Sequence, residues 1–162
     1  MIAVFSYLES YVLWGLELLF REALLTGRDC GDVRLPSLSL LNQDSSVRVD
    51  EAVARSVSDL RNWKRIRQEM NRFGLNLLEF KKYELTIDDL AQIRNTLVHK
   101  DGSMEKDIAG KLKKIEIEVE ADGKFFPNNV FLGSLMAWCD EFSIWFDGNI
   151  KKERNRIRSK PI

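Results

Sequence analysis

The chain has 162 residues, enough for one hydrophobic core and too few for two comfortable domains. Its 25 basic and 25 acidic residues cancel, so net charge excludes neither anionic nor cationic partners, and only local charge is informative. Cys30 and Cys139 lie far apart without a C-x-x-C spacing, and one histidine cannot complete a zinc site. We therefore predict no metal, no cofactor and two free thiols in a reducing cytoplasm.

Residues 2–25 are strongly apolar and predict a long helix, because apolar side chains recur at helical spacing over most of its circumference. Its length is that of a membrane span or a signal peptide. Charged residues interrupt it, however, and no basic segment precedes it. We expect a core helix of a soluble cytoplasmic protein, packed inside its own domain or against a second chain, without membrane association.

Residues 26–49 lose the helical period and predict a loop, which either covers an active-site groove or wraps the surface. The period returns at about Asp50 and runs to about Phe73, where Gly74 ends the helix. One side of this helix is apolar and the other is basic. The basic side is either a solvated face or a surface for RNA phosphates, with Arg61, Lys64 and Arg65 as the RNA-binding candidates.

Residues 86–104 predict a short helix with defined ends. Thr86 can cap the first turn, and Asp89 three residues later gives a shorter-armed version of the capping box. Asp101 and Gly102 end the helix, with the glycine just past the last turn. The helix is therefore expected to bury its apolar face and to present its polar C-terminal residues to a ligand.

Residues 103–114 predict another short helix with Ser103 as its cap. Apolar residues then alternate with glutamates over 115–120, which is a half-buried strand pattern. The Asp-Gly turn in 121–124 would return the chain as a second strand over 124–126. We expect a small β-hairpin that lies on the helices, because an isolated hairpin is marginally stable.

The last helix is predicted from about Val130 into the C-terminal tail, with Asn128 or Asn129 as its cap. Its two seams of large apolar residues indicate either a subunit interface or a fully buried central helix. The chain is predicted to be one helical domain over 1–150 with a basic tail over 151–162. The tail is a solubilising segment or a phosphate-binding arm, and its RNA-binding candidates are Lys151, Lys152 and Arg154.

Arg94, Asn95 and His99 lie in the last two turns of the predicted 86–104 helix, followed by Lys100 as a further RNA-binding candidate. Histidine moves protons near neutral pH, arginine holds a phosphate with two N–H groups, and an amide orients either. This set is suited to phosphodiester chemistry without a metal. The alternative is that His99 only caps carbonyl groups and complements the helix dipole.

The pattern R-N-x-x-x-H at the end of a helix, in a small helical chain, resembles the signature of the HEPN superfamily. This resemblance implies a mainly α fold, a HEPN-like helical bundle, here with a small β-hairpin before the last long helix. It also implies a metal-independent endoribonuclease with Arg94, Asn95 and His99 as catalytic residues. Such proteins are homodimers whose two motifs face one cleft. They act in toxin–antitoxin or phage-defence systems, which implies an antitoxin or other neutralising protein as a partner.

The count of histidines agrees with a dimer. Cleavage of RNA by its 2′-hydroxyl needs one group to accept a proton and one to return it. His99 cannot easily occupy both places in one chain, but a symmetric dimer supplies two copies. The alternative function is a non-catalytic HEPN-fold module that binds RNA or a protein.

Overall fold

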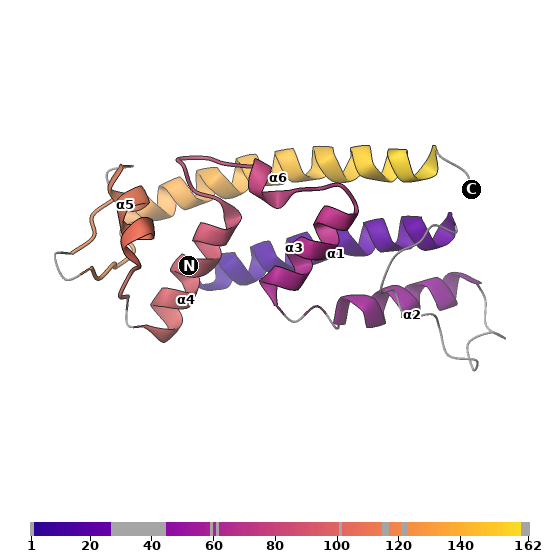
Figure 1. Cartoon of the computed structure of the whole chain (residues 1–162), viewed down its shortest axis with the longest axis horizontal. Helices are drawn as coiled ribbons and strands as arrows, with labels where there is room; N and C mark the ends of the chain where they lie inside the picture. Colours follow the sequence, from indigo (N-terminus) through magenta and orange to yellow (C-terminus); the bar gives the residue numbers. More distant parts are fainter. Residues whose placement is uncertain are drawn as a thin grey trace. The chain divides into compact units, whose positions relative to one another are not determined.

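The structure is a computed structural model that describes residues 2–26, 45–58, 60, 62–100, 102–114, 117–120 and 123–159. These residues are mainly helical and form no strand, which confirms the predicted mainly α class at that level (Figure 1). The helices are α1 (Ile2–Leu25), α2 (Ser45–Ser58), α3 (Trp63–Arg72), the 3₁₀ helix η2 (Leu77–Glu79), α4 (Ile87–His99), α5 (Lys106–Lys114) and α6 (Asn129–Arg158).

The chain divides into two compact units. The first consists of Met1–Leu8 and Leu77–Trp145 and contains α4 and α5. The second consists of Glu9–Asn76 and Phe146–Ile162 and contains α2 and α3. Helices α1 and α6 each contribute a part to both units, and each unit has its own buried side chains.

Aromatic side chains form the core of the first unit. The Phe80 ring meets Trp138 edge to face at 5.0 Å and Phe142 at 5.4 Å between ring centroids. Phe125 meets Phe131 in the same way at 5.0 Å. Four large apolar residues of α6, Phe131, Leu135, Trp138 and Phe142, are buried and therefore belong to the core. Aromatic pairs in this geometry add to the stabilisation from burial.

The core of the second unit lies among α1, α3 and the C-terminal part of α6. Phe20 of α1 meets Phe73 edge to face at 5.3 Å, and Tyr11 meets Phe146 at 5.4 Å. Gly15 allows close approach, because a Cβ atom there would lie 2.5 Å from the Phe146 ring. The buried side chains shared by these helices include Val12, Leu16, Leu19, Phe20, Ile66, Met70, Phe146 and Ile150.

Helix α1 has the length and the hydropathy of a membrane-spanning helix. The core helix of a soluble protein and a signal sequence meet the same two criteria, so length and hydropathy are weak evidence for a membrane span. Within the second unit, α1 buries one face and places a buried carboxylate, Glu22, among arginines of α6. That face has the character of a core helix.

The predicted single helix over 50–73 is wrong, because the structure has α2 and α3 in its place. The side-chain oxygen of Asn62 accepts a hydrogen bond from the Arg65 amide at 2.9 Å. Asn62 is thus the N-cap of α3, which begins as a separate helix. Helix α2 already begins at Ser45, within the predicted loop over 26–49, while residues 27–44 lie outside the described residues. Gly74 ends α3 at φ +83°, as predicted.

The predicted β-hairpin is absent from the described parts of 115–126, where residues 115, 116, 121 and 122 are not described. A turn does form, because the Glu120 amide donates to the Lys124 carbonyl at 2.8 Å, but the rest of the returning segment bonds to the turn after α4. The Phe125 amide donates to the Gly102 carbonyl at 3.0 Å, and the Met104 amide donates to the Gly123 carbonyl at 3.0 Å. Ser103 forms a bridge with Lys124 and does not cap α5, which begins at Lys106.

Helix α6 continues past residue 150, where the predicted domain ends and the predicted tail begins. The Asn128 side chain accepts a hydrogen bond from the Phe131 amide at 2.8 Å, which confirms the predicted cap. The helix continues through most of the predicted tail, where Glu153 and Ile157 are buried. The segment 151–158 is therefore helical and packs one side into the second unit.

Candidate functional site

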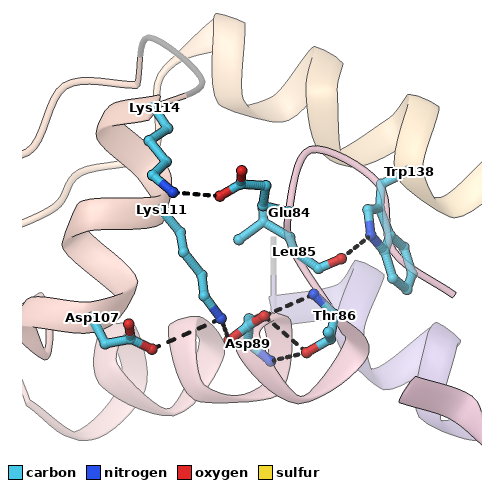
Figure 2. Close-up of polar contacts among 8 residues, drawn as sticks. All are labelled: Glu84, Leu85, Thr86, Asp89, Asp107, Lys111, Lys114 and Trp138. Atoms are coloured by element: carbon cyan, nitrogen blue, oxygen red, sulfur yellow. Dashed lines mark hydrogen bonds and ion pairs between the residues drawn. The ribbon is translucent and has the colours of Figure 1, made fainter. Parts of the chain in front are cut away.

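The motif helix α4 begins with a complete capping box, as predicted. The Asp89 amide donates to the Thr86 hydroxyl at 3.3 Å, and the Thr86 amide donates to the Asp89 carboxylate at 2.8 Å. The second carboxylate oxygen of Asp89 accepts from the Lys111 ammonium at 2.8 Å, which joins α4 to α5 (Figure 2). One side chain thus fixes both the start of α4 and its position against α5.

The charges of Asp89 and Lys111 stabilise each other. Burial alone would raise the pKa of Asp89, but the hydrogen bonds from Lys111 and Thr86 outweigh it and lower the pKa below its usual value. The hydrogen bond to Asp89 raises the pKa of Lys111. Both groups are therefore charged at neutral pH, and the pair holds the first turn of α4 in place.

The turn that enters α4 has an unusual backbone. Tyr83 and Glu84 have φ of 55° and 60°. Residues other than glycine seldom adopt such angles, and each costs roughly 1–3 kcal/mol. Contacts on both sides hold it, as Figure 2 shows: the Trp138 indole donates to the Leu85 carbonyl at 3.1 Å, and Lys114 pairs with Glu84 at 2.8 Å. The entry to α4 is thus anchored to α5 and α6 within the first unit.

The C-terminal end of α4 is capped by backbone groups. The amides of Lys100 and Gly102 both donate to the Thr96 carbonyl, at 2.9 and 3.3 Å. Gly102 has φ +80°, and a Cβ atom there would lie 3.0 Å from the Phe125 carbonyl oxygen. The helix therefore ends without help from the His99 imidazole, which weakens the alternative that His99 serves only as a cap.

The predicted catalytic residues lie together at this end of α4. Asn95 and His99 are exposed, Arg94 is partly buried, and the Arg94 guanidinium donates to the Asn95 side-chain oxygen at 3.0 Å. His99 makes no hydrogen bond or ion pair with any residue that the structure describes. Lys100 is exposed, and its ammonium lies 3.7 Å from the Glu105 carboxylate. A ligand can therefore reach the imidazole, the amide and the guanidinium from solvent.

The other predicted RNA-binding residues belong to the second unit. Lys64 and Arg65 are exposed on α3, while Arg61 lies outside the described residues. Lys151 and Lys152 are exposed on α6. Arg154 donates to the Glu22 carboxylate at 3.2 Å, so one of its N–H groups is already used.

Glu22 is a feature that the sequence reasoning missed. It is buried, and its carboxylate also accepts two hydrogen bonds from Arg158, at 2.6 and 2.7 Å. The hydrogen bond from Arg158 is the largest cause of a lowered Glu22 pKa, and Arg154 adds to it against the effect of burial. In the sequence, an acidic residue inside an apolar helix was the signal that could have identified this buried ion pair.

Among the described residues, no group of three or more histidine, cysteine and acidic side chains is placed to hold a metal ion. Comparison with protein-family models, with curated proteins and with solved structures finds no match to this chain. The site is therefore interpreted from its own residues.

Proposed function

We propose that this chain is a metal-independent endoribonuclease whose catalytic residues are Arg94, Asn95 and His99. The observation that carries the proposal is the hydrogen-bonded, accessible pair of Arg94 and Asn95 with an unengaged His99 one turn further along α4. A group that moves protons thus lies beside a group that binds phosphate. Their order in the chain also resembles the HEPN signature.

The proposed reaction starts with attack of a ribose 2′-hydroxyl on the adjacent phosphorus. One imidazole accepts the hydroxyl proton, and a second one protonates the 5′-oxygen that leaves. The products are a 2′,3′-cyclic phosphate and a 5′-hydroxyl end. Arg94 binds the non-bridging phosphate oxygens and stabilises the charge that grows on them, while Asn95 holds the guanidinium in position.

This reaction requires two proton-transfer groups, and His99 is the only histidine in each chain. We therefore propose a homodimer as the active form. Exposed apolar side chains on α6 within the first unit support it: Val130, Met136 and Ile144 are 60%, 66% and 75% exposed. A second copy of the chain would cover these side chains.

The biological role is proposed from the resemblance alone. A ribonuclease of the HEPN kind acts in a toxin–antitoxin or phage-defence system, with a protein partner that neutralises it. The second candidate function is an RNA-binding module without catalysis. The exposed cations Lys64, Lys151 and Lys152 in the second unit favour it, because phosphate contacts need only charge.

One assay distinguishes the two. Labelled single-stranded RNA is incubated with the wild type, His99→Ala and Arg94→Ala in EDTA. We expect the wild type alone to release 2′,3′-cyclic phosphate ends, and His99→Ala to be at least about a hundredfold slower. The melting temperature should stay the same, since His99 is exposed. Equal cleavage by His99→Ala, or none by a folded wild type, would reject the catalytic proposal.

The matched control for this assay is Lys106→Gln. Lys106 is exposed at the start of α5 and makes no ion pair with the described residues, so it tests the loss of one surface charge. We expect it to cleave at the wild-type rate. A sharp fall in the melting temperature of His99→Ala would instead assign His99 a structural role.

A further inference from the structure

The second unit carries a groove of about 390 Å³ between α1 and the C-terminal part of α6. Its apolar part is made by Trp14 and Leu18 of α1 and Ile150 of α6. The volume lies within the range of small-ligand sites, roughly 300–1,000 Å³. None of the proposed catalytic residues lines this groove, so it requires an explanation of its own.

Trp14 gives the groove a flat aromatic surface. It is 46% exposed, and its indole stacks on Tyr11 with the ring planes 18° apart and the centroids 5.9 Å apart. The Tyr11 hydroxyl donates in turn to Asp147 of α6. The indole is thus held by a second ring that is itself fixed, which is a ready surface for a flat ligand.

Positive charge gathers toward the other end of the groove. Arg154 and Arg158 line it and share the single buried carboxylate of Glu22, and Lys151 and Asp147 line the groove as well, so these five groups together carry one net positive charge. Lys151 and Asn155 also line the groove, are exposed, and have side chains without a hydrogen bond or ion pair to any described residue. Their ammonium and amide are available to a ligand.

The spacing of these groups suits a nucleotide chain. Trp14 and Glu22 are eight residues apart on α1, so their Cα atoms lie about 12 Å apart along the helix axis. Proteins bind single strands by stacking bases on aromatic rings and following the phosphates with positive charge. An acidic peptide would pair with the cations but would have no ring to stack on the indole and no base edge for the Asn155 amide to contact.

We propose that this groove is an accessory binding site for single-stranded RNA. A base stacks on Trp14, the Asn155 amide contacts an edge of a base, and phosphates lie along Lys151, Arg154 and Arg158. The site rests on the proposed function for its substrate class and extends it with a second contact, away from the motif on α4.

The test measures binding separately from cleavage. Anisotropy of a labelled single-stranded RNA is recorded with the full chain carrying His99→Ala, with and without Trp14→Ala or Trp14→Phe. We expect Trp14→Ala to weaken binding about fivefold to a hundredfold and Trp14→Phe to retain most of the affinity. Tyr7→Ala is the matched control, because Tyr7 is a 75% exposed aromatic residue of the same helix outside the groove.

Salt dependence tests the phosphate contacts. We expect Lys151→Gln to reduce the slope of log affinity against log salt by about 0.7, the value for one phosphate on a single strand. Lys81→Gln, an exposed lysine outside the groove, should leave the slope unchanged. Unchanged binding in Trp14→Ala with an intact fold, or equal affinity for an RNA duplex, would overturn the inference.

Three further outcomes test this inference, and the last two separate it from the proposed function. If polyglutamate displaces the RNA and binds in a Trp14-dependent way with equal affinity, the groove is a peptide site and the inference fails. Trp14-dependent RNA binding by a wild type that does not cleave would support the groove and reject the ribonuclease. Cleavage that requires His99, with RNA binding independent of Trp14, would reject only the groove.

Discussion

The Asp89 carboxylate lies 2.8 Å from the Lys111 ammonium, and this ion pair joins the first turn of α4 to the last turn of α5. Asp89 is buried and also completes the capping box with Thr86. We expect Asp89→Ala to lower the free energy of unfolding by about 1–3 kcal/mol, since it removes a cap and leaves a lysine without its main partner. Urea titration measures the change.

Asp107→Ala is the matched control for that change. Asp107 lies 3.8 Å from the same lysine, but its side chain is 83% exposed. Exposed ion pairs contribute little, so we expect the free energy of unfolding to change by less than about 0.5 kcal/mol. Equal effects of Asp107→Ala and Asp89→Ala would show that the buried pair does not hold α4.

Acid should destabilise both units, through Asp89 in the first and Glu22 in the second. The folded pKa of Asp89 is lowered below its unfolded value of about 3.9, and that of Glu22 below about 4.3. Each carboxylate therefore contributes stability that is fully present above the unfolded pKa and is lost as the pH falls through the folded pKa. We expect the free energy of unfolding to fall steadily below about pH 4.

Urea titrations between pH 7 and pH 2.5 measure this dependence. Asp89→Asn removes one of the carboxylates whose pKa is lowered by folding, so its free energy of unfolding should vary less with pH below pH 4 than that of the wild type. A variant that follows the wild-type pH dependence would contradict the lowered pKa of Asp89. Glu22→Gln provides the same comparison for the second unit.

Two glycines should respond to alanine in opposite directions. Gly102 has φ +80° and a Cβ atom there would lie 3.0 Å from the Phe125 carbonyl oxygen, so Gly102→Ala should destabilise by about 1–3 kcal/mol. Gly110 lies within α5, and a Cβ atom there would have nothing within 4 Å. Gly110→Ala should stabilise by about 0.5–1 kcal/mol. Thermal melts of both variants check the signs, and destabilisation by both would contradict them.

The parts of the fold that the sequence predicted correctly depend on local chemistry. Thr86 and Asp89 form their capping box within four residues. Asn128 caps α6 by accepting a hydrogen bond from the amide three positions further on. Gly74 ends α3 with a positive φ that glycine adopts most readily. Such signals are readable because the groups that interact are neighbours in the chain, and the motif at the end of α4 was found for the same reason.

The parts that the sequence did not predict depend on distant or competing partners. Alternation over 115–120 suggested a hairpin, but Phe125 donates its amide to Gly102, which lies far away in the chain. The helical period across 50–73 concealed the break before Asn62, where one side chain begins a new helix. The site shows the same limit: spacing placed His99 beside Asn95, yet only the backbone cap on Thr96 shows that the imidazole is not needed there.

The proposed dimer makes the exposed apolar side chains of Val130, Met136 and Ile144 necessary for activity. A carboxylate at the centre of a contact between two copies would be buried without a partner, which is strongly unfavourable. We expect Ile144→Asp to weaken dimerisation at least about thirtyfold and to abolish RNA cleavage together with it. Sedimentation equilibrium measures the first effect and the assay in EDTA the second.

Leu25→Asp is the control for this change, because Leu25 is a 63% exposed apolar residue of α1 in the second unit. It adds the same charge to an exposed apolar position away from those three residues and should leave both dimerisation and cleavage at wild-type levels. The two measurements must also fall together as the protein is diluted, since a monomer holds one His99. A chain that cleaves RNA while it sediments as a monomer would need a second proton-transfer group other than histidine, and the pairing of two motifs would then be wrong.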